Sequence, residues 1–253
     1  MLTIQRQLVD FLAPWAADSL VSDVRIGLGY TAVALESGHA GVAWTPKSES
    51  HSCTHFSSAG SLTGRPASVL LSMLCHTQSP LARAVGLATA NALLSARPNP
   101  QATSDEVIHS LALTPDDRVA MVGHFAPVVA NIQKSGCRLD ILELNPQRGG
   151  TLCPEEGRTA LAQCSVAIIT GTSLINGTFD QVLADLGSPR AAVLLGPSSP
   201  LCTEAFLGTK ITHIAGARVR DMAAVLRVVS EGGGTMLMKP HLDFVTLPLC
   251  QGA

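Results

Sequence analysis

Apolar residues recur at helical spacing near the start of the chain, at Ile4, Leu8, Phe11, Leu12 and Trp15. These positions fall on one face of a helix, which predicts a helix over residues 2–16. Three short apolar and β-branched runs follow, separated by glycine-containing turns. This pattern predicts an antiparallel three-stranded meander, with strands at 23–28, 31–36 and 41–45.

Two alanine- and leucine-rich segments, 65–77 and 81–96, return to helical spacing. Ser79 and Pro80 between them suit the cap and the first turn of the second helix. Residues 97–101 contain two prolines beside polar residues, which is typical of a linker. We therefore predict a small α+β domain over residues 1–99.

After residue 110 the pattern changes to apolar runs that alternate with helical segments. Strands are expected at 118–122, 138–144, 166–170, 192–195 and 212–215, and helices at 127–134, 155–163, 179–186 and 222–229. Repeated strand, helix, strand units predict a parallel sheet with helices on both faces. Residues 100–253 are therefore predicted to form a Rossmann-like α/β domain.

A dinucleotide-like fingerprint occurs at residues 27–32, which read Gly-Leu-Gly-Tyr-Thr-Ala. Such a fingerprint needs a helix that starts directly after it and receives the pyrophosphate. The residues that follow are β-prone and reach a second turn within a few positions. We therefore interpret residues 27–32 as a tight hairpin between two strands.

The composition restricts the classes of partner. Among 253 residues 46% are hydrophobic, which suffices for a sizeable core, while 14% are charged and the net charge is −2. No basic face for nucleic acid is expected, and no apolar run approaches the roughly 18 residues that span a bilayer. The seven cysteines show no paired spacing, and the first residues do not have the pattern of a signal peptide, so a reducing, cytoplasmic location with free thiols is predicted.

Candidate ligand-binding residues gather where the predicted parallel strands end, because loops there present backbone amides to small molecules. Gly171, Gly177 and Gly196 permit tight turns, and short polar side chains stand beside them. The candidates are Gly123, His124, Glu143, Gly171, Thr172, Ser173, Asn176, Gly177, Thr178, Gly196, Pro197, Ser198 and Ser199. A simpler interpretation is that Asn176 or Thr178 caps the next helix and that Pro197 and Pro200 shape a rigid turn.

Glu143 lies 20 residues after Gly123, a separation that suits an acidic residue that binds a ribose hydroxyl. The turn between them begins with the bulky residues His124 and Phe125 rather than a glycine loop. These side chains would block the close backbone approach that a pyrophosphate needs. The spacing therefore leaves a nucleoside or a compact anion as the candidate ligand and argues against ordinary NAD binding.

A cluster of metal-ligating residues, His51, Cys53 and His55, lies in a polar segment. In an extended chain alternate side chains share one side, so the three could bind one divalent transition metal with a position left open. The alternative is that these are ordinary solvated side chains, because no second pair at structural-zinc spacing accompanies them.

The chain resembles the "putative heavy-metal chelation" family, whose members join an enolase-N-terminal-like domain to a Rossmann-like domain. The resemblance rests on long strings in both halves: IGLGYTAVAL, GVAWTP, AGSLTGRPAS, AVGLATANAL, VAMVGHFAPVV, ILELNP, ITGTSLINGTFDQVL, VLLGPSSP, IAGARVRD and EGGG. It implies this two-domain α/β fold, and it implies the handling of a metal or a metal chelate.

Three hypotheses of function follow. The first is a protein that binds a metal ion, a metal chelate or an anionic metabolite between the two domains. The second is an enzyme that uses a nucleotide-type cosubstrate in the same cleft, and the third is a protein-interaction module. A homodimer is expected from the frequency of two-fold symmetry among soluble proteins.

Overall fold

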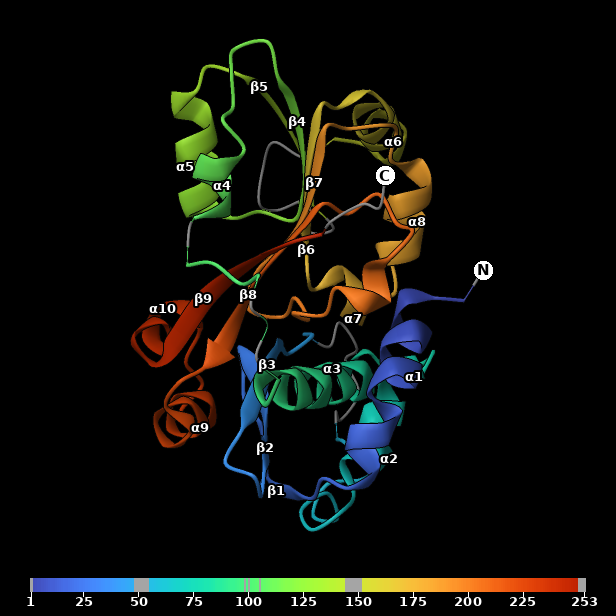
Figure 1. The fold of residues 1–253 in the computed structure, drawn as a ribbon, viewed down its shortest axis with the longest axis vertical. Helices are drawn as coiled ribbons and strands as arrows, with labels where there is room; N and C mark the ends of the chain where they lie inside the picture. The colour runs from blue at the N-terminus through green and yellow to red at the C-terminus, as the bar shows by residue number, and fades with distance from the viewer. Residues whose placement is uncertain are drawn as a thin grey trace.

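Two β-sheets organise the chain, and each forms one lobe of the molecule in Figure 1. The computed structural model describes residues 2–47, 55–97, 99, 101–104, 106–143 and 152–249. The smaller sheet has the strand order β1-β2-β3, and the larger sheet has the order β5-β4-β6-β7-β8-β9. This is the predicted α/β class, with a three-stranded antiparallel sheet and a six-stranded sheet that is mainly parallel.

The smaller sheet is the predicted meander of β1 (Val21–Ile26), β2 (Tyr30–Leu35) and β3 (Ala40–Trp44). The helices α1 (Ile4–Ala17), α2 (Ala67–Ser72) and α3 (Pro80–Ser95) belong to the same lobe. A Cβ on Gly41 would lie 2.2 Å from the amide nitrogen of Ala92, so glycine lets α3 approach β3 closely. Ser79 accepts a hydrogen bond from the Ala82 amide and caps α3, as its position in the sequence predicts.

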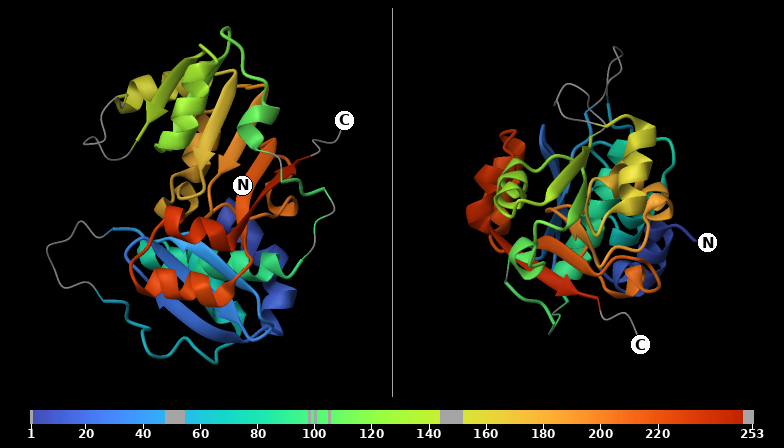
Figure 2. Two further views of the ribbon diagram at one scale, coloured as in Figure 1. Left: turned by 90° about the vertical axis from the view of Figure 1, so that its left-hand side faces the viewer. Right: turned by 90° about the horizontal axis from the view of Figure 1, so that it is seen from above.

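The other face of this sheet is covered from the far end of the sequence, by α9 (Met222–Ser230) and α10 (Thr235–Met238). Figure 2 shows these helices, in orange and red, lying across the blue strands. Val225, Val229 and Met238 are buried in one cluster with Tyr30 and with other residues of β2 and β3. Because both faces are covered, all six positions of β2 are buried.

The hairpin predicted at residues 27–32 is confirmed, since the Gly27 amide donates to the Tyr30 carbonyl at 2.9 Å and β1 pairs antiparallel with β2. Gly27, the first glycine of the hairpin, allows close packing against α9. A Cβ on Gly27 would lie 2.1 Å from the carbonyl oxygen of Val229, so only glycine lets the end of α9 rest on the hairpin. Gly232, with a φ of 80°, ends α9 at this contact.

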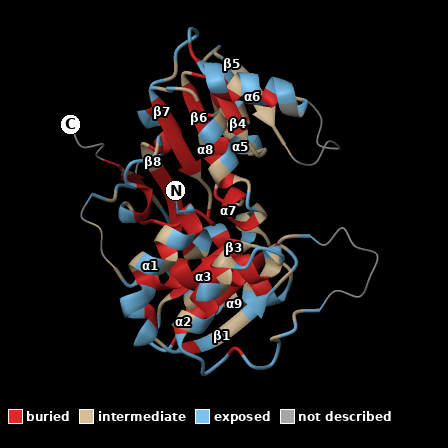
Figure 3. Ribbon diagram, turned by 90° about the vertical axis from the view of Figure 1, so that its right-hand side faces the viewer, coloured by how far each residue is buried: buried red, intermediate tan, exposed pale blue. Residues whose placement is uncertain are grey.

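The larger sheet contains five parallel strands, β4 (Arg118–Val122), β5 (Arg138–Leu142), β6 (Val166–Thr170), β7 (Ala191–Leu195) and β8 (His213–Val219). One face is covered by α4 (Val107–Ser110) and α5 (Ala126–Lys134), and the other by α6 (Pro154–Gln163) and α8 (Phe179–Asp185). Figure 3 shows that β6, β7 and α3 are buried along most of their length. Apolar strands with both faces covered are typical of parallel sheets.

Several boundaries differ from the sequence-based expectations. The helix predicted over 65–77 begins at Ala67 and continues from Met73 as the 3₁₀ turn η1 (Met73–Cys75), where Leu74 packs on Gly86. The strand expected at 138–144 ends at Leu142. The largest difference is β9 (Leu242–Pro248), which was not predicted and which runs antiparallel beside β8 over seven residue pairs. After β8 the chain passes through α9 and α10 and returns as β9 in the opposite direction. Local periodicity in the sequence does not indicate the direction of a strand.

The shorter helical segments include α7 (Ser173–Asn176) and the 3₁₀ turns η3 (Glu204–Phe206) and η4 (Lys239–His241). The domain boundary near Asn99 stays a prediction, because α9 and α10 follow that boundary in the sequence and still pack on the smaller sheet.

Candidate functional site

The carboxyl ends of the parallel strands face the smaller lobe. The amide of Trp44, at the end of β3, donates to Ser198 Oγ at 2.9 Å, directly after β7. Gln5 Nε2 of α1 donates to the Leu174 carbonyl of α7 at 3.1 Å. The loops that sequence analysis selected therefore lie at the junction of the two lobes.

The strand order places a topological switch point between β4 and β6. The chain passes from β4 outward to β5 on one side and then to β6, β7 and β8 on the other side. In open α/β sheets the loops separate at such a point, and ligands bind in the crevice outside the carboxyl ends. The predicted residues Gly123 and His124 follow β4, and Gly171 and Thr172 follow β6.

The two loops meet at this point. Gly123 has a φ of 88°, and a Cβ there would lie 3.0 Å from Cγ2 of Thr170. Thr170 Oγ1 lies 3.1 Å from Thr172 Oγ1 and accepts a hydrogen bond from the Thr172 amide at 3.3 Å. Both threonines are half-buried, so their hydroxyls line a partly accessible edge.

His124 is half-buried and stands at the entrance to α5. The N-cap of this helix is Phe125, whose side chain makes no capping hydrogen bond, so the first amides of α5 lack a side-chain acceptor. Glu143 directly follows Leu142, whose carbonyl accepts from the Gly123 amide at 2.8 Å. His124 and Glu143 are thus brought to neighbouring strand ends, as the sequence predicts.

The loop after β7 is packed rather than open. Pro197, Ser198 and Ser199 are buried, and Ser198 Oγ is occupied by the Trp44 amide. A Cβ on Gly171 would lie 2.7 Å from Ser199 Oγ, which is buried and has no hydrogen-bond partner in the part of the chain that the structure describes. Gly196, with a φ of 112°, turns the chain into this loop.

The loop after β6 has two ends with different neighbours. Ser173 is buried and donates from Oγ to the Thr170 carbonyl at 2.6 Å. At the far end of α7, Asn176 and Thr178 are half-buried and Gly177 is exposed, with a φ of 75°. Thr178 occupies the N-cap position of α8, but its side chain makes no capping hydrogen bond.

Arg83 lies beside this far end and is not among the residues that the sequence patterns indicated. It is 8% exposed and donates from Nε to the Ile175 carbonyl and from Nη1 to the carbonyls of His76 and Thr77. Burial lowers the pKa of this guanidinium. The available signal was an arginine near the start of a helix whose other residues are mostly apolar.

The predicted metal ligands are not brought together in what the structure describes. His51 and Cys53 lie outside the described residues, and His55 is exposed. The described ranges contain no group of three or more His, Cys, Asp or Glu side chains placed to hold a metal ion.

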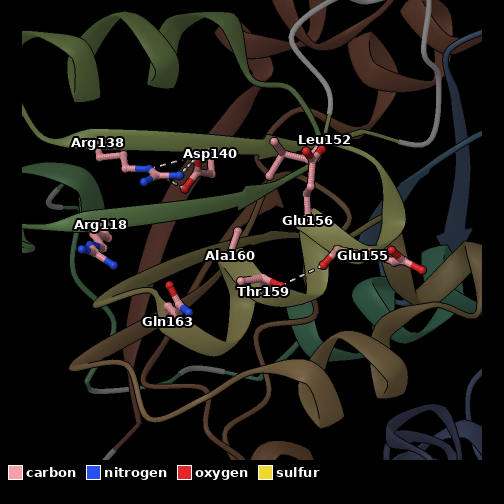
Figure 4. Close-up of a pocket in the computed structure, with 9 residues that line it drawn as sticks. All are labelled: Arg118, Arg138, Asp140, Leu152, Glu155, Glu156, Thr159, Ala160 and Gln163. Carbon is pink, nitrogen blue, oxygen red and sulfur yellow. Dashed lines mark hydrogen bonds and ion pairs between the residues drawn. The ribbon is translucent and has the colours of Figure 1, made fainter.

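A surface depression of about 340 Å³ lies elsewhere, between α6 and the strands β4 and β5 (Figure 4). Arg118 and Arg138 start these two strands, so the depression extends from the amino-terminal edge of the sheet. Several of its polar groups already have partners: Arg138 pairs with Asp140 at 3.0 Å, and Glu156 accepts a hydrogen bond from the Cys153 amide at 3.0 Å. We therefore place the candidate site at the carboxyl edge.

No helix within the described residues is both long enough and apolar enough to cross a membrane.

Two family models match the chain, and both carry the description "putative heavy-metal chelation". One matches residues 9–94 and the other residues 106–248. An uncharacterized protein of Methanocaldococcus jannaschii is 31% identical over 163 residues, and the match spans 62% of this chain and 62% of that relative.

Solved structures confirm the fold. A member of the same family with unknown function from Pyrococcus horikoshii has a TM-score of 0.85 at 21% identity, covering 98% of this chain and 100% of that one. Another, from Desulfitobacterium hafniense DCB-2, has a TM-score of 0.81 at 22% identity, covering 97% of each chain.

Proposed function

Because the chain belongs to the "putative heavy-metal chelation" family, we propose that it binds a metal chelate or a similar anionic small molecule where the strands β4 and β6 end, between the two lobes. The observation that carries the proposal is the meeting of the Gly123 turn with Thr170 at the switch point. Half-buried polar groups and an uncapped helix start converge there, whereas the loop after β7 is packed.

The chemistry of the edge suits an anion. Threonine hydroxyls and the amides of Ala126 and Val128 are hydrogen-bond donors, although Pro127 between them has no N–H. The positive end of a helix dipole also favours negative charge. His124 adds an imidazole, which can ligate a transition metal or, when protonated, pair with an anion. A chelate would bring further donors of its own, so one histidine would be sufficient to complete its coordination.

Direct binding of a bare divalent transition metal is the second form of the proposal. It would use Cys53 with His51 or His55, the only predicted cluster of thiolate and imidazole. The two forms differ in which residues matter: His124 and Thr172 for the chelate, and Cys53 for the bare ion.

The test begins with elemental analysis of protein purified anaerobically without chelators. Calorimetric titrations with nickel, zinc or cobalt chloride, and with their citrate complexes, then follow. We expect His124→Ala to weaken citrate-complex binding about tenfold or more, and His109→Ala, at an exposed histidine, to have no effect. Loss of binding in Cys53→Ala alone would establish the bare-ion form, and equal binding by all variants would contradict both.

A nucleotide-dependent enzyme is the second candidate function. Glu143 directly follows β5 and lies beside the Gly123 turn, which is the place of a ribose-binding carboxylate in nucleotide-binding sheets. Glu143→Gln should weaken a bound nucleoside while it leaves citrate complexes bound. A nucleotide screen by thermal shift that finds no ligand would reject this candidate. The homodimer and the cytoplasmic location stay predictions from the sequence.

A further inference from the structure

The buried Arg83 carries a charge that no carboxylate neutralises within the described chain. Its three hydrogen bonds all go to backbone carbonyls, those of Ile175, His76 and Thr77. The nearest acid along the following segment, Asp180, accepts instead from the Ile4 amide at 3.4 Å. A guanidinium remains protonated when buried, so a cation with carbonyl partners alone attracts an anion.

One end of the guanidinium is unused. Nε and Nη1 make these three hydrogen bonds, whereas Nη2 has no acceptor among the residues that the structure describes. A Cβ on Gly177 would lie 3.8 Å from Nη2 and 3.9 Å from Cζ. Gly177 is exposed and has no side chain, so no side chain of that residue covers this end of the guanidinium.

Two further polar residues adjoin Gly177 in the chain. Asn176 and Thr178 stand on either side of Gly177 and are half-buried. In the described part of the chain, neither side chain forms a hydrogen bond, and Thr178 does not cap α8. An amide and a hydroxyl beside a buried guanidinium are the donors that proteins use for carboxylates and phosphates.

We propose that Arg83 Nη2, Asn176 and Thr178 form a binding site for a small oxyanion, either a carboxylate or a phosphate. The site lies at the far end of α7 from the β4 and β6 turns, so it does not depend on the function proposed above. The Nη2 bond would be charge-assisted, and Asn176 and Thr178 would supply neutral donors.

Arg83 also joins the two lobes, through the Ile175 carbonyl. A substitution of Arg83 would therefore test the anion site and the stability together. Asn176→Asp avoids this problem, since the residue is the last of α7, is half-buried and makes no side-chain hydrogen bond within the described residues. Gln133→Glu, on the exposed face of α5, makes the same amide-to-carboxylate change far from the site and is the matched control.

The experiment titrates the full chain with inorganic phosphate and, separately, with citrate, and follows the amide resonance of Gly177 by NMR and the heat by calorimetry. We expect saturable binding in the millimolar range or tighter. Asn176→Asp should weaken it about tenfold or more, Thr178→Val should weaken it less, and Gln133→Glu should leave it unchanged. Phosphate that binds more tightly than citrate would identify a phosphate site, and the reverse a carboxylate site.

Two results would overturn the proposal. One is that neither anion moves the Gly177 resonance, and the other is that Asn176→Asp and Gln133→Glu reduce binding equally. Anion binding that His124→Ala leaves unchanged would separate this site from the carboxyl-edge site. Arg83→Gln, with its unfolding followed in urea, should abolish anion binding even under conditions where the variant remains folded.

Discussion

The carboxylate of Asp117 accepts two hydrogen bonds from the guanidinium of Arg190, from Nε at 3.0 Å and from Nη2 at 2.8 Å. Ser165 Oγ donates to the same carboxylate at 2.7 Å, and the Thr114 amide donates at 2.9 Å. Asp117, Ser165 and Arg190 each directly precede a strand, β4, β6 and β7 respectively. One buried carboxylate thus holds together the amino ends of the central strands, and the opposite edge is the one that carries open polar loops.

Asp117→Asn should reduce the free energy of unfolding by about 2 kcal/mol, because it removes a charge-assisted interaction and leaves Arg190 without its carboxylate. Urea unfolding measures the loss. Asp116→Asn, at the exposed preceding residue, is the control and should have little effect. Equal midpoints for the two variants would show that the Asp117 contacts are energetically unimportant.

The stability should also depend on pH through Asp117. The hydrogen bonds from Arg190 hold the pKa of its carboxyl well below the usual range. Since the folded pKa lies below the unfolded one, the stabilisation is complete above the unfolded pKa of about 4 and is lost as the pH falls toward the folded value. The difference in unfolding free energy between wild type and Asp117→Asn should therefore be constant near neutrality and shrink below about pH 4. A difference that stays constant on acidification would contradict this assignment.

Gly27→Ala should destabilise the protein by about 2 kcal/mol, because the new methyl group would collide with the Val229 carbonyl and displace α9 from the smaller sheet. Thermal unfolding measures the effect. Gly234→Ala is the control, since no atom lies within 4 Å of a Cβ there and its φ is −119°. A Gly27→Ala protein as stable as Gly234→Ala would mean that α9 does not pack on the hairpin in solution.

The described cysteines should differ in reactivity. Cys153 is exposed, whereas Cys164 and Cys202 are buried. Burial raises the pKa of Cys202 to about 12, which removes the reactive thiolate at neutral pH. Brief treatment of the native protein with iodoacetamide, followed by peptide mass mapping, should modify Cys153 and leave Cys164 and Cys202 unmodified. Rapid labelling of Cys202 would show that the segment around η3 opens.

Most of the helices and strands could be predicted from the sequence, because each depends on local spacing. Ser79 and Pro80 mark the start of α3, and the apolar runs 118–122 and 166–170 match β4 and β6 residue for residue. The same patterns located the turns at Gly123 and Gly171, since a loop must follow each buried strand. The antiparallel β9 was missed because its direction depends on where α9 and α10 carry the chain.

The order of most helices and strands follows from the sequence alone, as do the two kinds of sheet and the positions of the glycine-rich loops, because periodicity and backbone preference act over a few residues. Which of those loops are open depends on the tertiary structure. It packed Ser198 against Trp44, placed α9 on the smaller sheet and brought Arg83 beneath Gly177, 94 positions later in the chain. Such contacts depend on how whole helices and sheets pack, which no short stretch of sequence specifies.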